Sequence, residues 1–234
     1  MSTESAGLEA EPAVAEGMFG AGVDRARAFT ADLARRGEEL GLIGPLELPR
    51  LWTRHILNCA LLAPLVIPGR VGDVGSGAGL PGLVLAIARP DVQFVLIEPM
   101  ERRVDWLRSE AKELGLDNVE VLRARAEDLH LDRRSTASSA LASQDRDAIP
   151  VARARGFDQV TARAVSALGK LIPITAPLVR AGGQLLFLKG ASVDAEIASA
   201  AKAIRRARLR DVEVLELGAG KVPEITRVFR ATVD

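Results

Sequence analysis

The stretch Val71–Gly82, with the sequence VGDVGSGAGLPG, decides the fold of this chain. It starts with β-branched residues, continues through closely spaced glycines, and ends in a proline and a glycine. Glycine tolerates positive φ and lets a ligand approach the backbone, and proline is well accepted in the first turn of a helix. The stretch therefore predicts a strand, a ligand-binding loop and a helix, the opening unit of a nucleotide-type binding site.

The glycines of this loop fit two sequence patterns. Gly77, Gly79 and Gly82 follow the dinucleotide pattern G-x-G-x-x-G. Asp73–Gly79 reads D-x-G-x-G-x-G, which resembles the first motif of class I S-adenosylmethionine (AdoMet) methyltransferases. A pyrophosphate suits bare N–H groups at a helix N-terminus, whereas AdoMet has no phosphate and tolerates an acid beside the loop. The glycines alone favour AdoMet slightly and leave both ligands open.

An acid follows the next apolar run. Phe94–Glu98 reads FVLIE, and Glu98 stands at the expected end of the second strand. An acid in this position binds the ribose hydroxyls of either ligand class. Because Pro99 follows, Glu98 could instead be a favourable charge at a helix N-terminus. The residue predicts an adenosine site without choosing the ligand.

Composition indicates a cytoplasmic protein. The chain has 234 residues and is 48% hydrophobic, which suits one domain with a full core. Its single cysteine, Cys59, excludes a disulfide framework and is expected to fill the core. The N-terminal residues lack the pattern of a secretory signal. The longest apolar stretch, residues 56–67, is too short for a membrane span.

Charge is balanced overall but unevenly distributed. Lys and Arg number 31, as do Asp and Glu, so net charge indicates no partner. Basic residues crowd one segment, namely Lys202, Arg205, Arg206, Arg208 and Arg210. Such a cluster can face RNA phosphates or form a solvated helix face, and both remain open. Aromatic residues make up only 3%, which disfavours a base-stacking platform.

Hydrophobic periodicity predicts alternating strands and helices. Strands are expected at 70–74, 94–98, 119–122, 157–161, 184–188, 212–217 and 226–233. Helices are expected at 23–40, 47–65, 99–114 (with Met100 on its apolar face), 165–179 with breaks near Pro173 and Pro177, and 194–208. No crossover helix fits between the last two strands, so they should pair antiparallel. The pattern predicts a doubly wound, mostly parallel α/β sheet of seven strands with a terminal antiparallel hairpin.

Outside this sheet the chain is expected to carry three special segments. Residues 1–17 are rich in Ala, Glu and Ser and are expected to be disordered. Residues 18–68 form a helical extension of a single domain that spans 18–234. Residues 132–155 mix Ser, Ala, Arg and Asp with little periodicity, which is typical of a flexible insertion.

Two further segments favour AdoMet. Ala126 and Glu127 follow the third strand, where class I methyltransferases border the adenine with a short polar segment. Arg163 follows the fourth strand, at the carboxyl edge where open α/β sheets bind their ligands.

Taken together, these motifs resemble the bacterial 16S rRNA guanine-N7 methyltransferase G family, also called glucose-inhibited division protein B. The resemblance covers roughly residues 20–233. Its pieces are LWxRHILN at 51–58, DVGSGAGLPG at 73–82, IEP at 97–99, RAE at 125–127, RAV at 163–165 with Leu168, and LKG at 188–190. The chain departs from the family at Asn58-Cys59, where Asp-Ser is frequent, and in the length of 132–155.

The resemblance implies a Rossmann-like class I methyltransferase that uses AdoMet and no metal. Its partner would be 16S rRNA or the small ribosomal subunit. A monomer is expected, since nothing in the sequence argues against one. The resemblance implies AdoMet contacts at Gly75, Leu80, Ala126, Glu127 and Arg163. With Gly77 of the glycine loop and the strand-end acid Glu98, these are the expected cofactor-binding residues. No catalytic base is expected, because guanine N7 carries a lone pair and no proton. Arg54, His55 and Lys189 match the family without a defined role.

Two alternatives remain at this point. The first is a class I methyltransferase with another substrate, and the second is a nicotinamide-dependent oxidoreductase with the same glycine loop.

Overall fold

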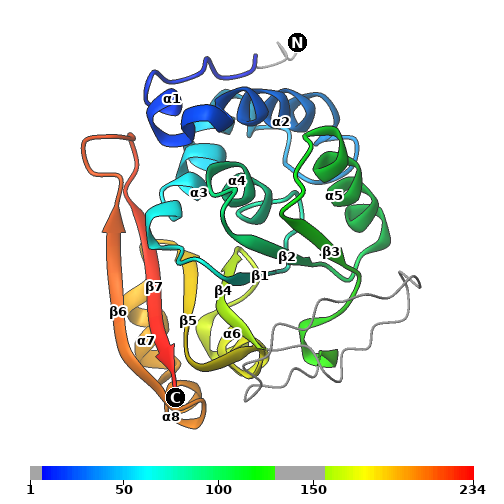
Figure 1. The fold of residues 1–234 in the computed structure, drawn as a ribbon. Helices are drawn as coiled ribbons and strands as arrows, with labels where there is room; N and C mark the ends of the chain where they lie inside the picture. The colour runs from blue at the N-terminus through cyan, green and yellow to red at the C-terminus, as the bar shows by residue number, and fades with distance from the viewer. Residues whose placement is uncertain (1–6, 130–155) are drawn as a thin grey trace.

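One seven-stranded sheet with helices on both faces forms the protein (Figure 1). The computed structural model describes residues 7–129 and 156–234. The strand order is β3-β2-β1-β4-β5-β7-β6. The strands are β1 (Arg70–Val74), β2 (Gln93–Ile97), β3 (Val119–Leu122), β4 (Phe157–Arg163), β5 (Val179–Lys189), β6 (Leu209–Leu217) and β7 (Thr226–Val233). The expected doubly wound sheet is confirmed.

The pairing of the strands also follows the expectation. β1 pairs in parallel with β2 and β4, and the parallel order continues to β3 on one side and β5 on the other. β7 pairs antiparallel with both β5 and β6, which confirms the terminal hairpin. Because all five parallel strands end at the same edge, the loops after β1, β2, β3 and β4 come together there.

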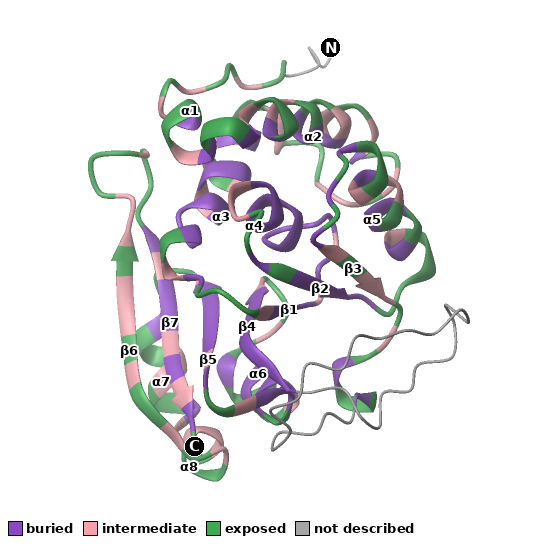
Figure 2. Ribbon diagram, in the orientation of Figure 1, coloured by how far each residue is buried: buried purple, intermediate pink, exposed green. Residues whose placement is uncertain are grey.

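Two hydrophobic layers cover the sheet. One layer joins the sheet to α1 (Val14–Phe19), α2 (Val23–Arg36), α3 (Asn58–Ala60), α4 (Gly82–Ala88) and α5 (Glu101–Glu113). The other joins it to α6 (Leu168–Thr175), α7 (Val193–Ser199) and α8 (Ala201–Arg206). Figure 2 shows that buried residues concentrate on the inner strands and on the helix faces turned toward them. This double coverage explains why the inner strands read as nearly continuous apolar runs.

The N-terminal region is more ordered than its composition suggests. Residues 14–17 belong to α1, and Ala15 is fully buried in the core. The backbone N–H of Glu9 donates to the carbonyl of Leu48 at 2.9 Å. The expectation of disorder over 1–17 is therefore wrong for residues 14–17, because tertiary packing orders them. Residues 1–6 lie outside the described residues.

The expected helix over 47–65 is a chain of short helices. A 3₁₀-helix at Leu48–Arg50 leads into a π-helix at Leu51–Leu57, followed by α3 and a 3₁₀-helix at Ala63–Leu65. π-helices are rare in proteins and occur frequently at functional sites. This one lies over the carboxyl edge of the sheet.

Other helix boundaries differ from the expected ones. The helix over 23–40 ends at Arg36, and the one over 165–179 begins at Leu168 and contains Pro173. The helix over 194–208 is split at Ala200 into α7 and α8. Met100 precedes α5 and is 47% exposed rather than on its apolar face.

The expected insertion at 132–155 lies outside the described residues. Within 7–129 and 156–234, no helix combines the length and the apolar character needed to cross a membrane.

Trp106 connects α5 to the loop after β1. Its side chain is 2% exposed, and its Nε1–H donates to the carbonyl oxygen of Ala78 at 3.0 Å. We predict that Trp106→Phe lowers the free energy of unfolding by about 1–3 kcal/mol, because the Ala78 carbonyl loses its buried donor. Urea denaturation measures this loss. The change Ser109→Ala, at a half-buried position on the same helix whose hydroxyl donates to the exposed Glu113, should stay within about 0.5 kcal/mol of wild type. Equal effects of the two changes would contradict the prediction.

Candidate functional site

The loop after β1 turns sharply on its glycines. Gly75, Gly77 and Gly79 have φ values of +71°, +54° and +95°. A Cβ atom on Gly75 would lie 2.7 Å from Cγ2 of Val165, and one on Gly79 would lie 2.5 Å from Cδ1 of Leu83. The backbone conformation and the close neighbours both require glycine at these two positions.

Asp73 fixes the end of this loop from beneath. Its side chain is fully buried, and Oδ2 accepts the backbone N–H of Gly82 at 3.0 Å in the first turn of α4. A Cβ atom on Gly82 would lie 2.5 Å from this same oxygen, so the helix can approach only through glycine. Burial raises the pKa of Asp73 to about 7. Among the described residues, nothing donates to its second oxygen, Oδ1.

Glu98 joins two loops at the end of β2. Its side chain is 2% exposed, with Oε2 accepting the N–H of Gly77 and Oε1 the N–H of Met100, both at 3.0 Å. Met100 is the residue before α5, so the helix-start interpretation of Glu98 is supported, while ribose binding stays a prediction. The carboxylate stabilises the start of a helix, and it also lies directly against the glycine loop.

The segment after β3 lies at the same edge. Ala126 and Glu127 form a 3₁₀-helix with Asp128; Ala126 is buried and Glu127 is exposed. β3 is the neighbour of β2, and the N–H of Glu98 donates to the carbonyl of Leu122 at 3.1 Å. The two acids Glu98 and Glu127 therefore follow adjacent strand ends.

Leu80 is 8% exposed and packs in the hydrophobic layer of α4. Its expected contact with a ligand stays a prediction.

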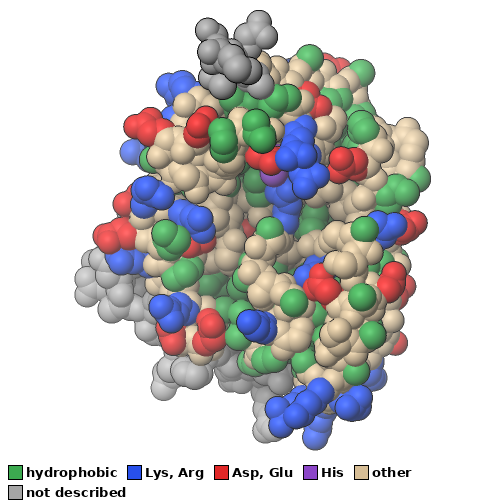
Figure 3. Space-filling view, turned by 180° about the vertical axis from the view of Figure 1, so that it is seen from behind, with side chains coloured by type: hydrophobic (Ala, Val, Ile, Leu, Met, Phe, Trp, Pro, Cys, Tyr) green, Lys and Arg blue, Asp and Glu red, His purple; other side chains and the backbone are tan. Residues whose placement is uncertain are grey.

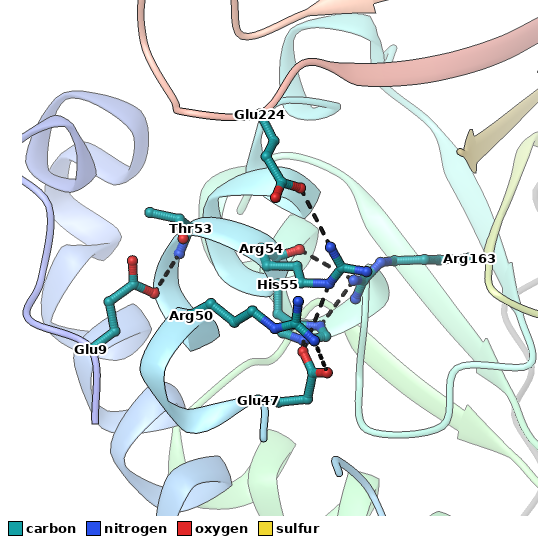
Figure 4. A network of polar contacts seen from close by, with 8 residues as sticks. All are labelled: Glu9, Glu47, Arg50, Thr53, Arg54, His55, Arg163 and Glu224. Carbon is teal, nitrogen blue, oxygen red and sulfur yellow. Dashed lines mark hydrogen bonds and ion pairs between the residues drawn. The ribbon is translucent and has the colours of Figure 1, made fainter. Parts of the chain in front are cut away.

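Arg163 ends β4 and points toward the π-helix (Figure 4). One of its guanidinium nitrogens, Nη2, donates to the carbonyl of Arg54 at 3.2 Å and lies 2.9 Å from Nδ1 of His55. The opposite ring nitrogen of His55, Nε2, lies 2.6 Å from Oε2 of Glu47. Burial and the charge of Arg163 lower the pKa of His55, while Glu47 raises it to a lesser extent.

Lys189, at the end of β5, is held by neighbouring elements. Its Nζ lies 2.7 Å from Oε2 of Glu196 and donates to the carbonyl of Ser166 at 3.1 Å. Glu196 also accepts the N–H of Leu168, the first residue of α6. These contacts are sufficient to explain Lys189 as a residue that holds β5 against α6 and α7.

Cys59 and Asn58 occupy the departure from the family pattern. Cys59 is fully buried, which confirms it as a core residue, and burial raises the pKa of its thiol to about 11. A thiol with that pKa is a poor nucleophile at neutral pH. Asn58 donates to Oγ1 of Thr226 at 2.5 Å and so connects α3 to β7.

Two residues of this edge were missed at the level of sequence. Glu47 lies 8 residues before His55, a separation that a continuous α-helix does not bring into contact. Thr161 pairs with Asp73 across β4 and β1, and its buried Oγ1 has no partner among the described residues. Only the strand register reveals that these two polar side chains share one face.

The basic cluster lies far from this edge along the sheet. The cluster lies on α8, in the turn after it and at the start of β6, and all of its members are exposed: Lys202, Arg205, Arg206, Arg208 and Arg210. Figure 3 shows Lys and Arg side chains gathered at the lower end of the molecule, where Figure 1 places α8. Since Leu209 pairs with Val233 at the end of the antiparallel β7, this end is the amino edge of the parallel strands.

One acidic cluster could meet the geometry of a cation site. Asp32, Glu110 and Glu113 have ligand atoms within 4.8 Å of one another. Glu110 is fully buried beside Arg36, with 3.6 Å between the two charged groups, and burial raises its pKa to about 7. The arginine and the raised pKa already reduce the cost of this buried carboxyl group.

Comparison with known proteins gives consistent matches. The family model described as rRNA small subunit methyltransferase G matches residues 23–225. The ribosomal RNA small subunit methyltransferase G of Clavibacter sepedonicus is 57% identical over 230 residues, covering 98% of this chain and 99% of that protein. The protein of the same name from Leifsonia xyli subsp. xyli is 59% identical over 226 residues, covering 97% and 98%.

Solved structures support the fold. A SAM-dependent methyltransferase from Aquifex aeolicus superposes with a TM-score of 0.51 at 19% identity, covering 79% of this chain and 93% of that one. A predicted O-methyltransferase from Agrobacterium tumefaciens gives 0.52 at 18% identity, with 76% and 80% covered. At these identities the likeness concerns the fold alone, and it confirms the class I methyltransferase architecture.

We predict that Glu98→Gln destabilises the glycine loop. The amide oxygen can accept one of the two N–H groups, but the amide NH₂ would face the other donor. The expected loss is about 1–3 kcal/mol of unfolding free energy, measured by chemical denaturation. Glu101→Gln is the matched control, since Glu101 is exposed and pairs only with Arg123 in the described structure. A loss no larger than that of the control would contradict the role of Glu98.

Proposed function

Because the chain belongs to the rRNA small subunit methyltransferase G family, we propose that it transfers the methyl group of AdoMet to N7 of a guanine in 16S rRNA. The family membership that the sequence motifs predict is confirmed by these matches. It also favours AdoMet over a nicotinamide cofactor in the glycine loop. The observation that carries the proposal is the match over residues 23–225, which includes every residue of the site.

The residues at the carboxyl edge fit AdoMet. Its ammonium group is a hydrogen-bond donor, and Asp73 has a buried oxygen to which no described residue donates. Glu98 can accept from the ribose hydroxyls, while the glycines let the ligand approach the backbone. Ala126 and Glu127 would border the adenine, and Leu80 would pack against the ligand. Bound AdoMet supplies an electrophilic methyl group on a positively charged sulfur.

The protein's part in this chemistry is positioning. Guanine N7 offers a lone pair and has no proton to remove, so no general base is needed. The residues must align the base with the methyl group and accommodate charge that moves from sulfur to the base. Arg163 lies at the end of β4 and is the residue we assign to the methionine end of AdoMet or to the guanine.

The partner is 16S rRNA or the small ribosomal subunit, as the names of the relatives support. The enzyme would then act in the cytoplasm, where ribosomal subunits are present. We expect the enzyme to act as a monomer. No metal is required by the proposed chemistry.

We predict that Arg163→Ala abolishes most methylation with little effect on folding. A strain that lacks the gene for this protein should lose one 7-methylguanosine from 16S rRNA, as measured by nucleoside mass spectrometry. Wild type should restore it and Arg163→Ala should not, although both proteins accumulate and melt alike. Unchanged 7-methylguanosine in the deletion strain would reject the proposed function. Equal loss of folding and methylation would reject the role of Arg163.

We also predict that AdoMet binds more tightly as pH rises from about 5 to about 7. Asp73, whose pKa is raised to about 7, is neutral at the lower pH and ionised above it. Since only the carboxylate attracts the ligand's ammonium group, binding is linked to loss of this proton. Affinity should therefore rise by up to about tenfold per pH unit. Calorimetry measures this, and Asp73→Asn should bind more weakly with a flatter profile; a wild-type slope in the variant would contradict the prediction.

A further inference from the structure

Three side chains form a continuous chain of polar contacts above the carboxyl edge (Figure 4). Arg163 reaches Nδ1 of His55 at 2.9 Å, and Nε2 of His55 reaches Glu47 at 2.6 Å. The guanidinium group has only donors, so Nδ1 must accept and cannot carry a hydrogen. The ring hydrogen is therefore on Nε2 and is donated to the carboxylate. The two neighbours of His55 define a single neutral tautomer.

We propose that Glu47 and His55 are positioning residues for methyl transfer: Glu47 selects the tautomer of His55, and His55 then fixes the guanidinium of Arg163 in the site. The inference rests on the proposed function and assigns roles to two residues beyond the cofactor-binding set. Glu47 and His55 touch neither AdoMet nor the guanine in this scheme. They act through Arg163.

The geometry of the π-helix makes this arrangement possible. Residues Leu51–Leu57 present the carbonyl of Arg54 and the ring of His55 to the same nitrogen of Arg163. An arginine side chain has several rotatable bonds, and fixing it in advance removes that cost from the reaction step. His55 is suited to this because its side chain is only 13% exposed and that of Glu47 only 20%.

Burial, more than the neighbouring charges, lowers the pKa of His55 and keeps the ring neutral near neutral pH. Arg163 and Arg54 lower its pKa together with burial, whereas Glu47 raises it. Glu47 is also paired with Arg50 at 2.6 Å, and Arg54 with Glu224 at 3.4 Å. Cys59, which also lies close to Arg163, is a neutral thiol. In acid, a second proton on His55 would occupy Nδ1 and leave two donors facing each other, so Arg163 would be released.

The test compares the pH dependence of kcat for methylation of small ribosomal subunits at saturating AdoMet, which removes the linkage through Asp73. Wild-type kcat should fall in acid as His55 takes up its second proton. His55→Phe should lower kcat by roughly 10- to 100-fold and remove this acid limb. Glu47→Gln should lower the plateau and move the limb to lower pH, because the carboxylate no longer raises the pKa of His55. Glu224→Gln, an acid-to-amide change on the neighbouring arginine, should keep the wild-type profile.

A second measurement requires no activity. The chain has only two histidines, His55 and His130, so ¹⁵N-histidine labelling of a His130→Gln protein leaves one reporter. The ¹⁵N spectrum of neutral His55 should show an unprotonated Nδ1 and a protonated Nε2. Its pKa should fall in Glu47→Gln and rise in Arg163→Gln, since each change removes one neighbouring charge.

The outcomes separate the two proposals. A protonated Nδ1 in the neutral protein, or a Glu47→Gln enzyme with the wild-type plateau and acid limb, overturns the positioning role alone. Lack of methyl transfer by the wild-type protein overturns the proposed function and this role with it. If the variants lose thermal stability but keep the wild-type pH profile, the contacts serve folding alone, and the positioning role of Glu47 and His55 is overturned.

Discussion

The buried carboxylate of Asp73 is the constraint on which the site depends. It lies at the end of the central strand β1 and accepts the N–H of Gly82, so sheet and covering helix meet at one hydrogen bond. Burying a carboxyl group is costly unless its oxygens are satisfied, and here one oxygen remains without a donor in the described structure. The glycine at position 82, the close approach of α4 and the raised pKa of Asp73 all follow from placing this group beneath the loop.

Much of the fold could be predicted because its signals are local. The stretch Val71–Gly82 contains its strand, turn and helix start within a few residues, and each later strand carries its own apolar run. The hairpin of β6 and β7 followed from the short connection alone. Ala15 shows where this reasoning fails, because its burial depends on packing against distant core residues that composition cannot reveal.

The site could be predicted only in part. The strand-end residues Glu98 and Arg163 were found because parallel strands bring their carboxyl ends to one edge. Glu47 could not be found, since it meets His55 only through a 3₁₀-helix followed by a π-helix. An analysis of hydrophobic periodicity assumes one regular helix and does not predict a change from a 3₁₀-helix to a π-helix. Thr161 was missed for a different reason: its relation to Asp73 depends on the register between two strands.

The position of β7 inside the sheet has a consequence for synthesis. β7 is synthesised after β6, yet it lies between β5 and β6 in the sheet. Both of these strands pair with β7 and not with each other. While the chain emerges from the ribosome, β5 therefore has an open edge and β6 has no strand to join. Unpaired edges invite association between chains. A nascent chain that stalls before residue 226 would thus expose the unpaired edge of β5, which β7 covers in the folded protein.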